Sequence, residues 1–338
     1  MSIVKFTAFY PSRPYFADRK PTSIPKSTTD FFKKMDKVVF SNDNDSFLLR
    51  VCRDGRIIVR IKSLEKDIEG KNTRSIEQNV KHWSQYLEYL NSIYLLIDSA
   101  MLELDNNAYF NIHEITRRDA FRVSYKNGEW NGEQMADESL ASRFQRTRLF
   151  KESIYGGAWA LEMDFDQRQT VPIKIFDHAC QNFYKCSKQA IIIKYLSRLT
   201  KSISEYKVGS YENSIIFSWF IIESIMNDFW DKVLAEKDRQ ISPTEKRINK
   251  DRKKFLTGRE FPSSVVSNLL ELEGEIDYEE FKEINNVRGH RNDIVHSIGK
   301  KPITVKEARA ALNIARKMIE KRSGIDLHIN DGYHVFGL

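Results

Sequence analysis

The chain has 338 residues, of which 41% are hydrophobic and 30% charged, and its formal net charge is +7. This composition is typical of a folded globular protein and excludes disordered and fibrous chains. The length is sufficient for two ordinary domains, each with its own core. The positive charge is compatible with a polyanionic partner such as RNA but does not require one.

The cysteines, the start of the sequence and the apolar runs indicate where in the cell the protein is expected. Cys52, Cys180 and Cys186 are too few and too scattered for a disulfide framework or a zinc site. The sequence shows no secretory signal at its start, which predicts a cytoplasmic location. The most apolar run, residues 215–226, is too short and too polar to cross a bilayer. We therefore expect no membrane association.

Residues 1–170 are predicted to form an α+β region. The first 30 residues hold four of the eight prolines, which indicates an extended, loosely structured lead-in. Apolar residues alternate on both sides of Asp54-Gly55. This pattern predicts a β-hairpin over residues 47–61 that closes through a type I′ turn.

Three further elements are expected in this region. Ser75 and Gln78 form a capping box that predicts the start of a long helix. Residues at helical spacing give that helix an apolar stripe: Ile76, Val80, Trp83, Leu87, Leu90 and Tyr94. A second hairpin is expected around Asn127-Gly128, and a strand over residues 158–165.

Residues 171–338 are predicted to form an all-α domain. Apolar residues at helical spacing predict four principal helices, over residues 187–208, 212–235, 278–297 and 304–321. The last begins with a capping box of Thr304 and Glu307, and the first carries an apolar stripe of Ile192, Leu196, Leu199 and Ile203. The second of these is apolar almost all round, so it should be buried on several sides. Four such helices with an insertion over residues 236–277 and a short C-terminal tail are expected to form a bundle.

The third of these helices ends in a run that carries chemistry, from Arg291-Asn292 to Val295-His296. This run, the helix order and a Glu223 within the buried second helix resemble the HEPN superfamily, over about residues 172–322. The resemblance implies a four-helix bundle that acts as a metal-independent endoribonuclease. It also implies a homodimer in which both copies of the motif face a shared cleft, and a role as a toxin or antiviral defence effector.

The residue types suit RNA cleavage. RNA carries its own nucleophile, the 2′-hydroxyl, so cleavage needs proton exchange and stabilisation of an anionic phosphorane. Histidine exchanges protons near neutral pH, and the planar fork of arginine fits phosphate oxygens. We therefore predict that Arg291 and His296 are catalytic and that Asn292 orients the phosphate or the imidazole. Glu223 and Asp293 are expected to support them, and no metal or other cofactor is expected.

Helical geometry complicates this prediction. At about 100° per residue, positions 291 and 296 lie about 140° apart around an ideal helix. Arg291 and His296 can converge only if the helix unwinds, if the arginine reaches around it, or if a second subunit completes the site. A two-fold dimer is the simplest of these solutions.

Two alternatives for the motif stay open. In the first, Arg291 pairs with Glu223 inside the bundle and His296 caps its helix, since a charged glutamate in so apolar a helix needs a partner. The chain would then be a non-catalytic adaptor that binds RNA or protein. In the second, His290, Asp293 and His296 bind a metal ion, but their spacing is too wide unless the helix breaks.

Two weaker signals lie elsewhere. The insertion carries a basic run that suits either a path for RNA phosphates or an ordinary solvated helix: Lys246, Arg247, Lys250, Arg252, Lys253 and Lys254. No aromatic residues alternate with these charges, so base stacking is not expected there. Asp164 and Asp166 would share one face of a strand, as in magnesium-dependent nucleotidyltransferases. A plain surface strand explains them better, because only six residues separate Gly157 from Asp164, too few for the helix that such enzymes have there.

Overall fold

The computed structural model describes residues 3–23, 30, 33–66, 75–126, 129–134, 168–242, 245–296 and 302–332. It has an N-terminal antiparallel sheet followed by a mostly helical C-terminal half, as predicted. The chain divides into two compact units. The sheet unit comprises Met1–Thr200 and Leu327–Asn330, and the helical unit comprises Lys201–Asp326 and Asp331–Leu338. This division lies later in the chain than the boundary expected near residue 170.

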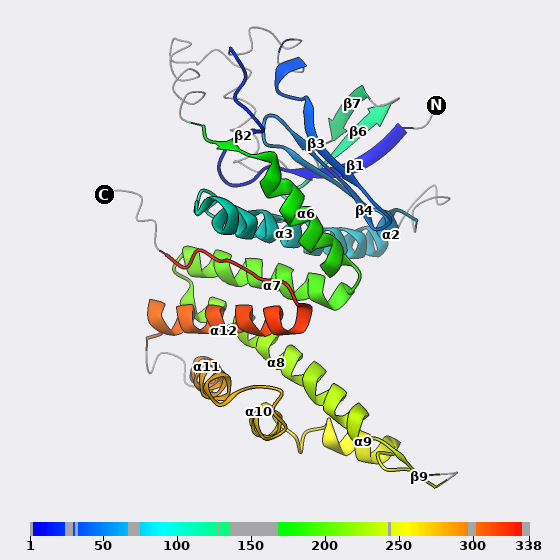
Figure 1. Ribbon diagram of the computed structural model, residues 1–338, viewed down its shortest axis with the longest axis vertical. Coiled ribbons are helices and arrows are strands. Elements are labelled where there is room, and N and C mark those ends of the chain that lie inside the picture. The colour runs from blue at the N-terminus through cyan, green and yellow to red at the C-terminus, as the bar shows by residue number, and fades with distance from the viewer. Residues whose placement is uncertain are drawn as a thin grey trace. The chain divides into compact units, whose positions relative to one another are not determined.

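The sheet unit is built on a six-stranded antiparallel sheet with the order β3-β4-β5-β1-β6-β7 (Figure 1). Its strands are β1 Ile3–Phe9, β3 Val38–Asp43, β4 Phe47–Cys52, β5 Ile57–Ile61, β6 Phe121–Lys126 and β7 Glu129–Gln134. A separate parallel pair joins β2 Phe16–Ala17 to β8 Thr170–Val171. The expectation of a loosely structured lead-in is wrong for β1, which pairs with both β5 and β6. The prolines begin only at Pro11, after this strand has ended.

The hairpin predicted over residues 47–61 is confirmed by the pairing of β4 with β5. Its turn differs from the prediction, because Gly55 has a positive φ of 89° and Asp54 does not. The N–H of Gly55 donates to the carbonyl of Cys52 at 3.0 Å, which is the pattern of a type I turn followed by a left-handed glycine. A Cβ at Gly55 would also lie 2.8 Å from the ring of Tyr15. Both the backbone conformation and the space therefore require glycine.

The second predicted hairpin is confirmed by the antiparallel pairing of β6 with β7. Its turn, residues 127–128, and the strand expected over residues 158–165 lie outside the described residues.

Helices α3 Ile76–Asp105 and α6 Ile173–Ser187 cover one face of the sheet, and the short α2 spans Lys62–Lys66 (Figure 1). The predicted capping box at Ser75 is present at the start of α3. The first two residues of the predicted stripe, Ile76 and Val80, are nevertheless 83% and 61% exposed. Helix α6 was not among the predicted helices. The ring of Phe183 from α6 packs against that of Phe47 from β4, with centroids 4.7 Å apart.

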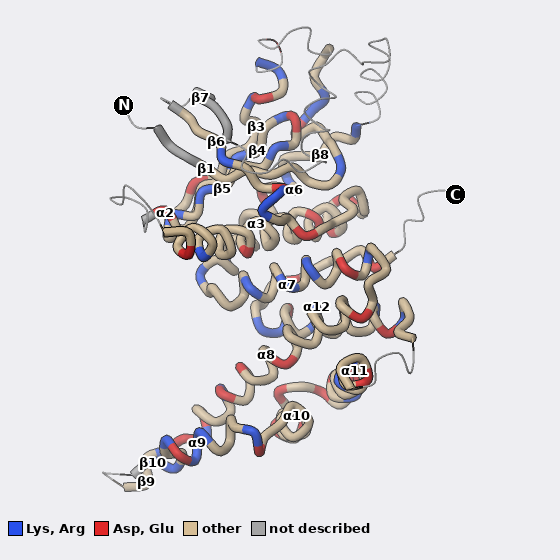
Figure 2. The backbone as a smooth tube through the Cα atoms, turned by 180° about the vertical axis from the view of Figure 1, so that it is seen from behind, with Lys and Arg blue, Asp and Glu red and all other residues tan. Residues whose placement is uncertain are grey.

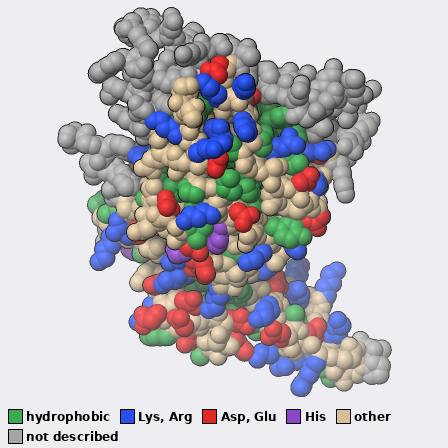
Figure 3. All heavy atoms as spheres, turned by 45° about the horizontal axis from the view of Figure 1, so that its top comes forward, with side chains coloured by type: hydrophobic (Ala, Val, Ile, Leu, Met, Phe, Trp, Pro, Cys, Tyr) green, Lys and Arg blue, Asp and Glu red, His purple; other side chains and the backbone are tan. Residues whose placement is uncertain are grey.

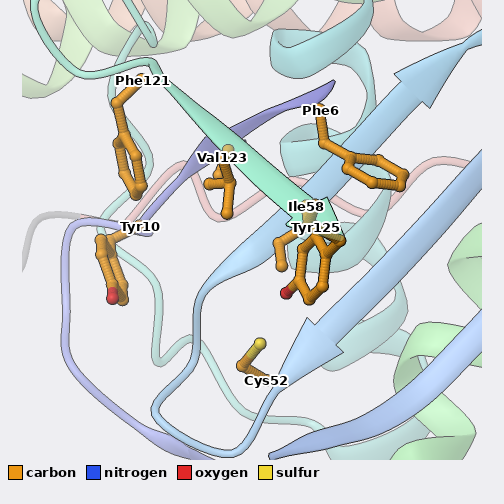
Figure 4. Close-up of a cluster of buried hydrophobic side chains, with 8 residues drawn as sticks. Phe6, Tyr10, Cys52, Ile58, Phe121, Val123 and Tyr125 are labelled. Carbon is orange, nitrogen blue, oxygen red and sulfur yellow. The ribbon is translucent and has the colours of Figure 1, made fainter. Parts of the chain in front are cut away.

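A second cluster of buried side chains lies on the opposite face of the sheet (Figure 4). It consists of Phe6, Ala8, Tyr10, Cys52, Ile58, Phe121, Val123 and Tyr125. The rings of Tyr10 and Phe121 stack, and those of Phe6 and Tyr125 meet edge to face. Burial raises the pKa of the Cys52 thiol to about 12, so this thiol stays protonated.

Helix α7 Ala190–Lys207 carries the chain from the sheet unit into the helical unit. The stripe predicted for this helix is buried: Ile192, Leu196, Leu199 and Ile203. The helical unit then contains α8 Tyr211–Lys237, α10 Ser263–Leu272, α11 Tyr278–His296 and α12 Val305–Ser323. Between α8 and α10 lie β9 Gln240–Ser242, β10 Glu245–Lys246 and α9 Lys250–Leu256.

Helix α8 is the centre of the helical unit and packs against α10, α11 and α12. Its apolar side chains are buried on several sides, as predicted, although Phe220 is 42% exposed. The capping box predicted for α12 is present at Thr304 and Glu307. The small residues of α12, including the buried Ala308 and Ala315, allow close packing of the neighbouring helix. In the described parts of the chain, no helix is both long and apolar enough to span a membrane.

The C-terminal tail returns to the sheet unit. Helix α12 ends at Gly324, whose φ is 68°, and Leu327 is buried further on. The N–H of His328 donates to Oγ of Ser99 on α3 at 2.8 Å. The imidazole of His178 on α6 lies 3.1 Å from the carboxylate of Glu103 on α3. Residues 327–330 therefore pack with α3, whereas the carbonyls of Asp331 and Gly332 accept from Tyr206 and Lys207 of the helical unit.

Candidate active site

Helix α11 presents the predicted motif at its C-terminal end. A reciprocal pair of hydrogen bonds starts the helix: the N–H of Glu280 donates to Asp277, and the N–H of Asp277 donates to Glu280. Ile284 and Val287 are the buried residues of this helix. The helix continues to His296, so the motif occupies its last turns without a break.

Arg291 lies on the inward side of α11, because it follows Val287 by four residues and Ile284 by seven. Its side chain is half-buried, and its Nη1 donates to Oδ1 of Asn292 at 3.0 Å. This bond fixes one edge of the guanidinium and leaves its other N–H groups for another acceptor. Asn292 thus bonds to Arg291, whereas the prediction was that it orients the phosphate or the imidazole.

His296 and Asp293 are exposed at the end of α11. Since α11 stays helical to residue 296, His296 lies about 140° around the helix axis from Arg291. The three routes to convergence considered above reduce to two, because the helix does not unwind between these residues.

Glu223 does not pair with Arg291. It is half-buried on α8, and its carboxylate accepts a hydrogen bond from Oγ of Ser263, at the start of α10. Among the described residues, neither a hydrogen bond nor an ion pair joins Glu223 to Arg291. The non-catalytic alternative expected Arg291 as the partner of Glu223, but the partner is Ser263 of the insertion.

Arg288 is a residue that the sequence reasoning missed. It is half-buried one turn before Arg291, and positions three apart share one side of a helix. Its Nη1 is buried and has no hydrogen-bond partner among the described residues. A buried N–H group of this kind favours an acceptor, so Arg288 and Arg291 together can hold an anion. In the sequence, the spacing of three residues between Arg288 and Arg291 could have revealed this pair.

Helix α12 holds α11 through two ion pairs. Lys317 and Lys321 of α12 bind Glu283 and Glu280 at 2.9 and 2.8 Å. At the start of α12, the side-chain hydrogen bond from Thr304 lowers the pKa of Glu307, and the nearby His290 also contributes. His290 precedes His296 by six residues, so it lies about 120° around the axis of α11 from His296.

The remaining candidates are separate from this site. The six basic residues predicted to bind RNA are all exposed, on β10, on α9 and between them. In the helical unit, α10 lies between α9 and α11 (Figures 1 and 2). No group of three His, Cys, Asp or Glu residues that could hold a metal ion occurs in the described residues, and His290, Asp293 and His296 form none. Asp164 and Asp166 lie outside the described residues.

Comparisons with known proteins add no relative. The chain matches no known protein family. It also matches no curated protein and no solved structure.

Proposed function

We propose that the helical unit is an endoribonuclease whose catalytic residues are Arg291 and His296. The observation that carries this proposal is the position of the motif at the solvent-facing end of α11, where Asn292 holds Arg291 and His296 is exposed. Because this end of the helix faces solvent, a substrate can reach both side chains. The resemblance of this run to HEPN ribonucleases gives the reaction class.

The reaction would proceed by transesterification. The 2′-oxygen attacks the adjacent phosphorus, its proton is taken up by a base, and the 5′-oxygen leaves with a proton from an acid, giving a 2′,3′-cyclic phosphate. His296 supplies the proton exchange at one of these oxygens. Arg291 and Arg288 stabilise the charge on the non-bridging oxygens. The cleavage requires no metal.

A homodimer would bring the two groups together. Within one chain, His296 and Arg291 point to different sides of α11. If α11 of a second copy crosses this helix, His296 of one copy can share a phosphate with Arg291 of the other. The proposed enzyme is therefore a dimer that cleaves cellular RNA in the cytoplasm as a toxin or antiviral effector, with the sheet unit as its sensor or recruitment part.

A non-catalytic adaptor is the second candidate. The observation that favours it is the same angular separation, because a single copy does not form a dyad. This adaptor would use Arg288 and Arg291 to hold a phosphate or carboxylate group without cleaving its ligand.

Cleavage of labelled single-stranded RNA in the presence of a chelator distinguishes the two candidates. We expect the wild-type chain to cleave, and His296→Ala and Arg291→Ala each to lose activity by about a hundredfold or more. His290→Ala is the matched control, since it removes a histidine from another side of the same helix. Circular dichroism verifies that each variant is folded.

Cleavage that persists in His296→Ala would move the active site elsewhere. No cleavage by the wild-type chain on any RNA, with binding retained, would favour the adaptor.

A further inference from the structure

The segment between α8 and α10 carries most of the excess charge of the chain. Residues 246–259 contain seven Lys or Arg residues and one Asp, a net charge of +6, whereas the whole chain has +7. The other 324 residues together carry +1. We name the described residues 238–242 and 245–259, with β9, β10 and α9, the arm. Its lysines and arginines gather at the end of α8 in the backbone view and at the lower right of the space-filling view (Figures 2 and 3).

The arm is held in a defined conformation. The N–H of Ile248 donates to Asp238 at 3.1 Å, and the side chain of Asn249 caps α9 by accepting from the N–H of Arg252. The indole N–H of Trp230 on α8 donates to the carbonyl of Leu256 at 2.9 Å. The basic residues are therefore presented by an ordered scaffold, and their positions relative to α8 are fixed.

Only some of these charges are already paired. Lys253 lies 3.5 Å from Asp231, and Lys246 lies 3.9 Å from Asp238. Lys250, Lys254 and Arg259 are exposed and form no ion pair with any described residue. A row of unneutralised cations on one short segment is complementary to a polyanion with closely spaced charges.

An exposed aromatic ring lies within this charge. Phe255 is 55% exposed and follows Lys254 directly. Its edge contacts Phe261, with centroids 5.5 Å apart, and Phe261 stacks on Trp230 at 6.1 Å. Phe255 is thus the outermost ring of three, held from beneath, with much of its surface in solvent. The expectation that no aromatic residue accompanies these charges is therefore incomplete, because it considered only the basic run itself.

We infer that the arm is a binding surface for single-stranded nucleic acid. The cations of α9 contact successive phosphates, and Phe255 stacks on one unpaired base. A double helix fits less well, since its bases are already stacked on one another. An acidic protein would use the cations but has no need of the supported ring. This inference does not depend on Arg291 and His296 being catalytic.

The test measures the fluorescence anisotropy of a labelled oligouridylate of about ten nucleotides, a length suited to a site of this size. The protein is the full chain with His296→Ala, so that cleavage cannot interfere. We expect affinity to fall steeply between about 50 and 200 mM salt. The triple variant Lys250→Glu, Arg252→Glu, Lys254→Glu should lose about tenfold or more in affinity.

Two control variants separate the surface from general effects. Lys81→Glu, Lys185→Glu and Lys306→Glu together change the net charge by the same amount at exposed positions outside the arm, and this variant should bind like the parent. Phe255→Ala should lose about tenfold, whereas Phe255→Tyr keeps an aromatic face and should lose little. Leu272→Ala removes another exposed apolar side chain, at 78% exposure, and should have no effect.

Equal binding by the arm triple variant and its parent, or an equal loss in the control triple variant, would overturn the inference. An affinity that is unchanged in Phe255→Ala would also overturn it, because the arm would then be only a general cationic patch. Tighter binding of a polyglutamate peptide or of duplex RNA than of the oligouridylate would replace this partner with an acidic protein or a double helix. An oligodeoxythymidylate in parallel shows whether RNA is preferred to DNA. Binding that persists without any cleavage by the wild-type chain would leave this inference standing while the nuclease proposal fails.

Discussion

The two units differ in how they treat charged side chains. In the sheet unit, Arg56 is 2% exposed and bonds to Asp36 and to the sulfur of Cys52. The nearby Asp54 accepts from the hydroxyl of Tyr10 at 2.7 Å. In the helical unit, Arg291 is half-buried and His296 is exposed. A buried N–H group of Arg288 has no hydrogen-bond partner among the described residues, and the same is true of Nε of Arg56.

This difference separates charges that stabilise the fold from charges that are available to a ligand. A buried cation that is paired with a carboxylate of its own chain has little capacity to bind anything else. An accessible cation without such a pair retains that capacity. The sheet unit therefore contains a buried ion pair, whereas Arg291 of the helical unit is partly open to solvent.

The largest expected effect comes from removing the buried cation of the sheet unit. Arg56→Met leaves Asp36 without this partner in the interior, and we expect the free energy of unfolding to fall by about 3–5 kcal/mol. Arg288→Met is the matched change in the helical unit. It removes a buried donor that has no partner there, so stability should stay within about 1 kcal/mol or rise. Urea unfolding followed by circular dichroism measures both, and equal losses would erase the contrast between the units.

A smaller effect is expected at Gly289 on α11. A Cβ at this position meets no atom within 4 Å, so Gly289→Ala should stabilise the helix by about 0.5–1 kcal/mol. Gly289 precedes His296 by seven residues and therefore shares its side of the helix. If RNA or a second copy approaches this side closely, the more stable variant should be less active. Unchanged cleavage together with a higher melting temperature would show that nothing packs there.

The smallest effect concerns pH. Burial lowers the pKa of His113 in the sheet unit below its ordinary value of 6.5, and the weaker influence of Asp119 and Glu114 opposes this shift. The folded state therefore favours the neutral imidazole. This contribution to stability is complete above about pH 6.5 and is lost as the pH falls towards the pKa of the folded state. His113→Gln should unfold with a flatter dependence on pH over this window, and an identical dependence would assign it to another group.

Local signals in the sequence were sufficient for much of the fold. The Asp54-Gly55 pair located a hairpin, and the capping boxes at Ser75 and Thr304 located two helix starts within one residue. The type of the turn was not predictable in this way, because the ring of Tyr15 packs against Gly55 from a distant part of the chain. The boundary between the units was missed for the same reason. Helix α6 belongs to the sheet unit through contacts such as Phe183 with Phe47, which no local pattern shows.

The candidate site was predictable in its position but not in its contacts. The motif was expected at the end of a helix, and α11 ends at His296. The partner of Glu223 could not be foreseen, because Ser263 comes from the insertion, whose packing depends on tertiary structure. The exposure of Phe255 depends equally on Phe261 and Trp230 beneath it. These features depend on tertiary packing, and they are also the ones that suggest a ligand.

The end of the chain is shared by both units, because residues 327–330 belong to the sheet unit and residues 331–338 to the helical unit. A protein truncated after residue 200 would lack the segment in which the N–H of His328 bonds to Ser99. During synthesis these residues leave the ribosome after all of α12. Residues 331–338 of the helical unit follow them. Both units therefore complete their packing only when the end of the chain has been synthesised, and neither is expected to finish folding long before the other.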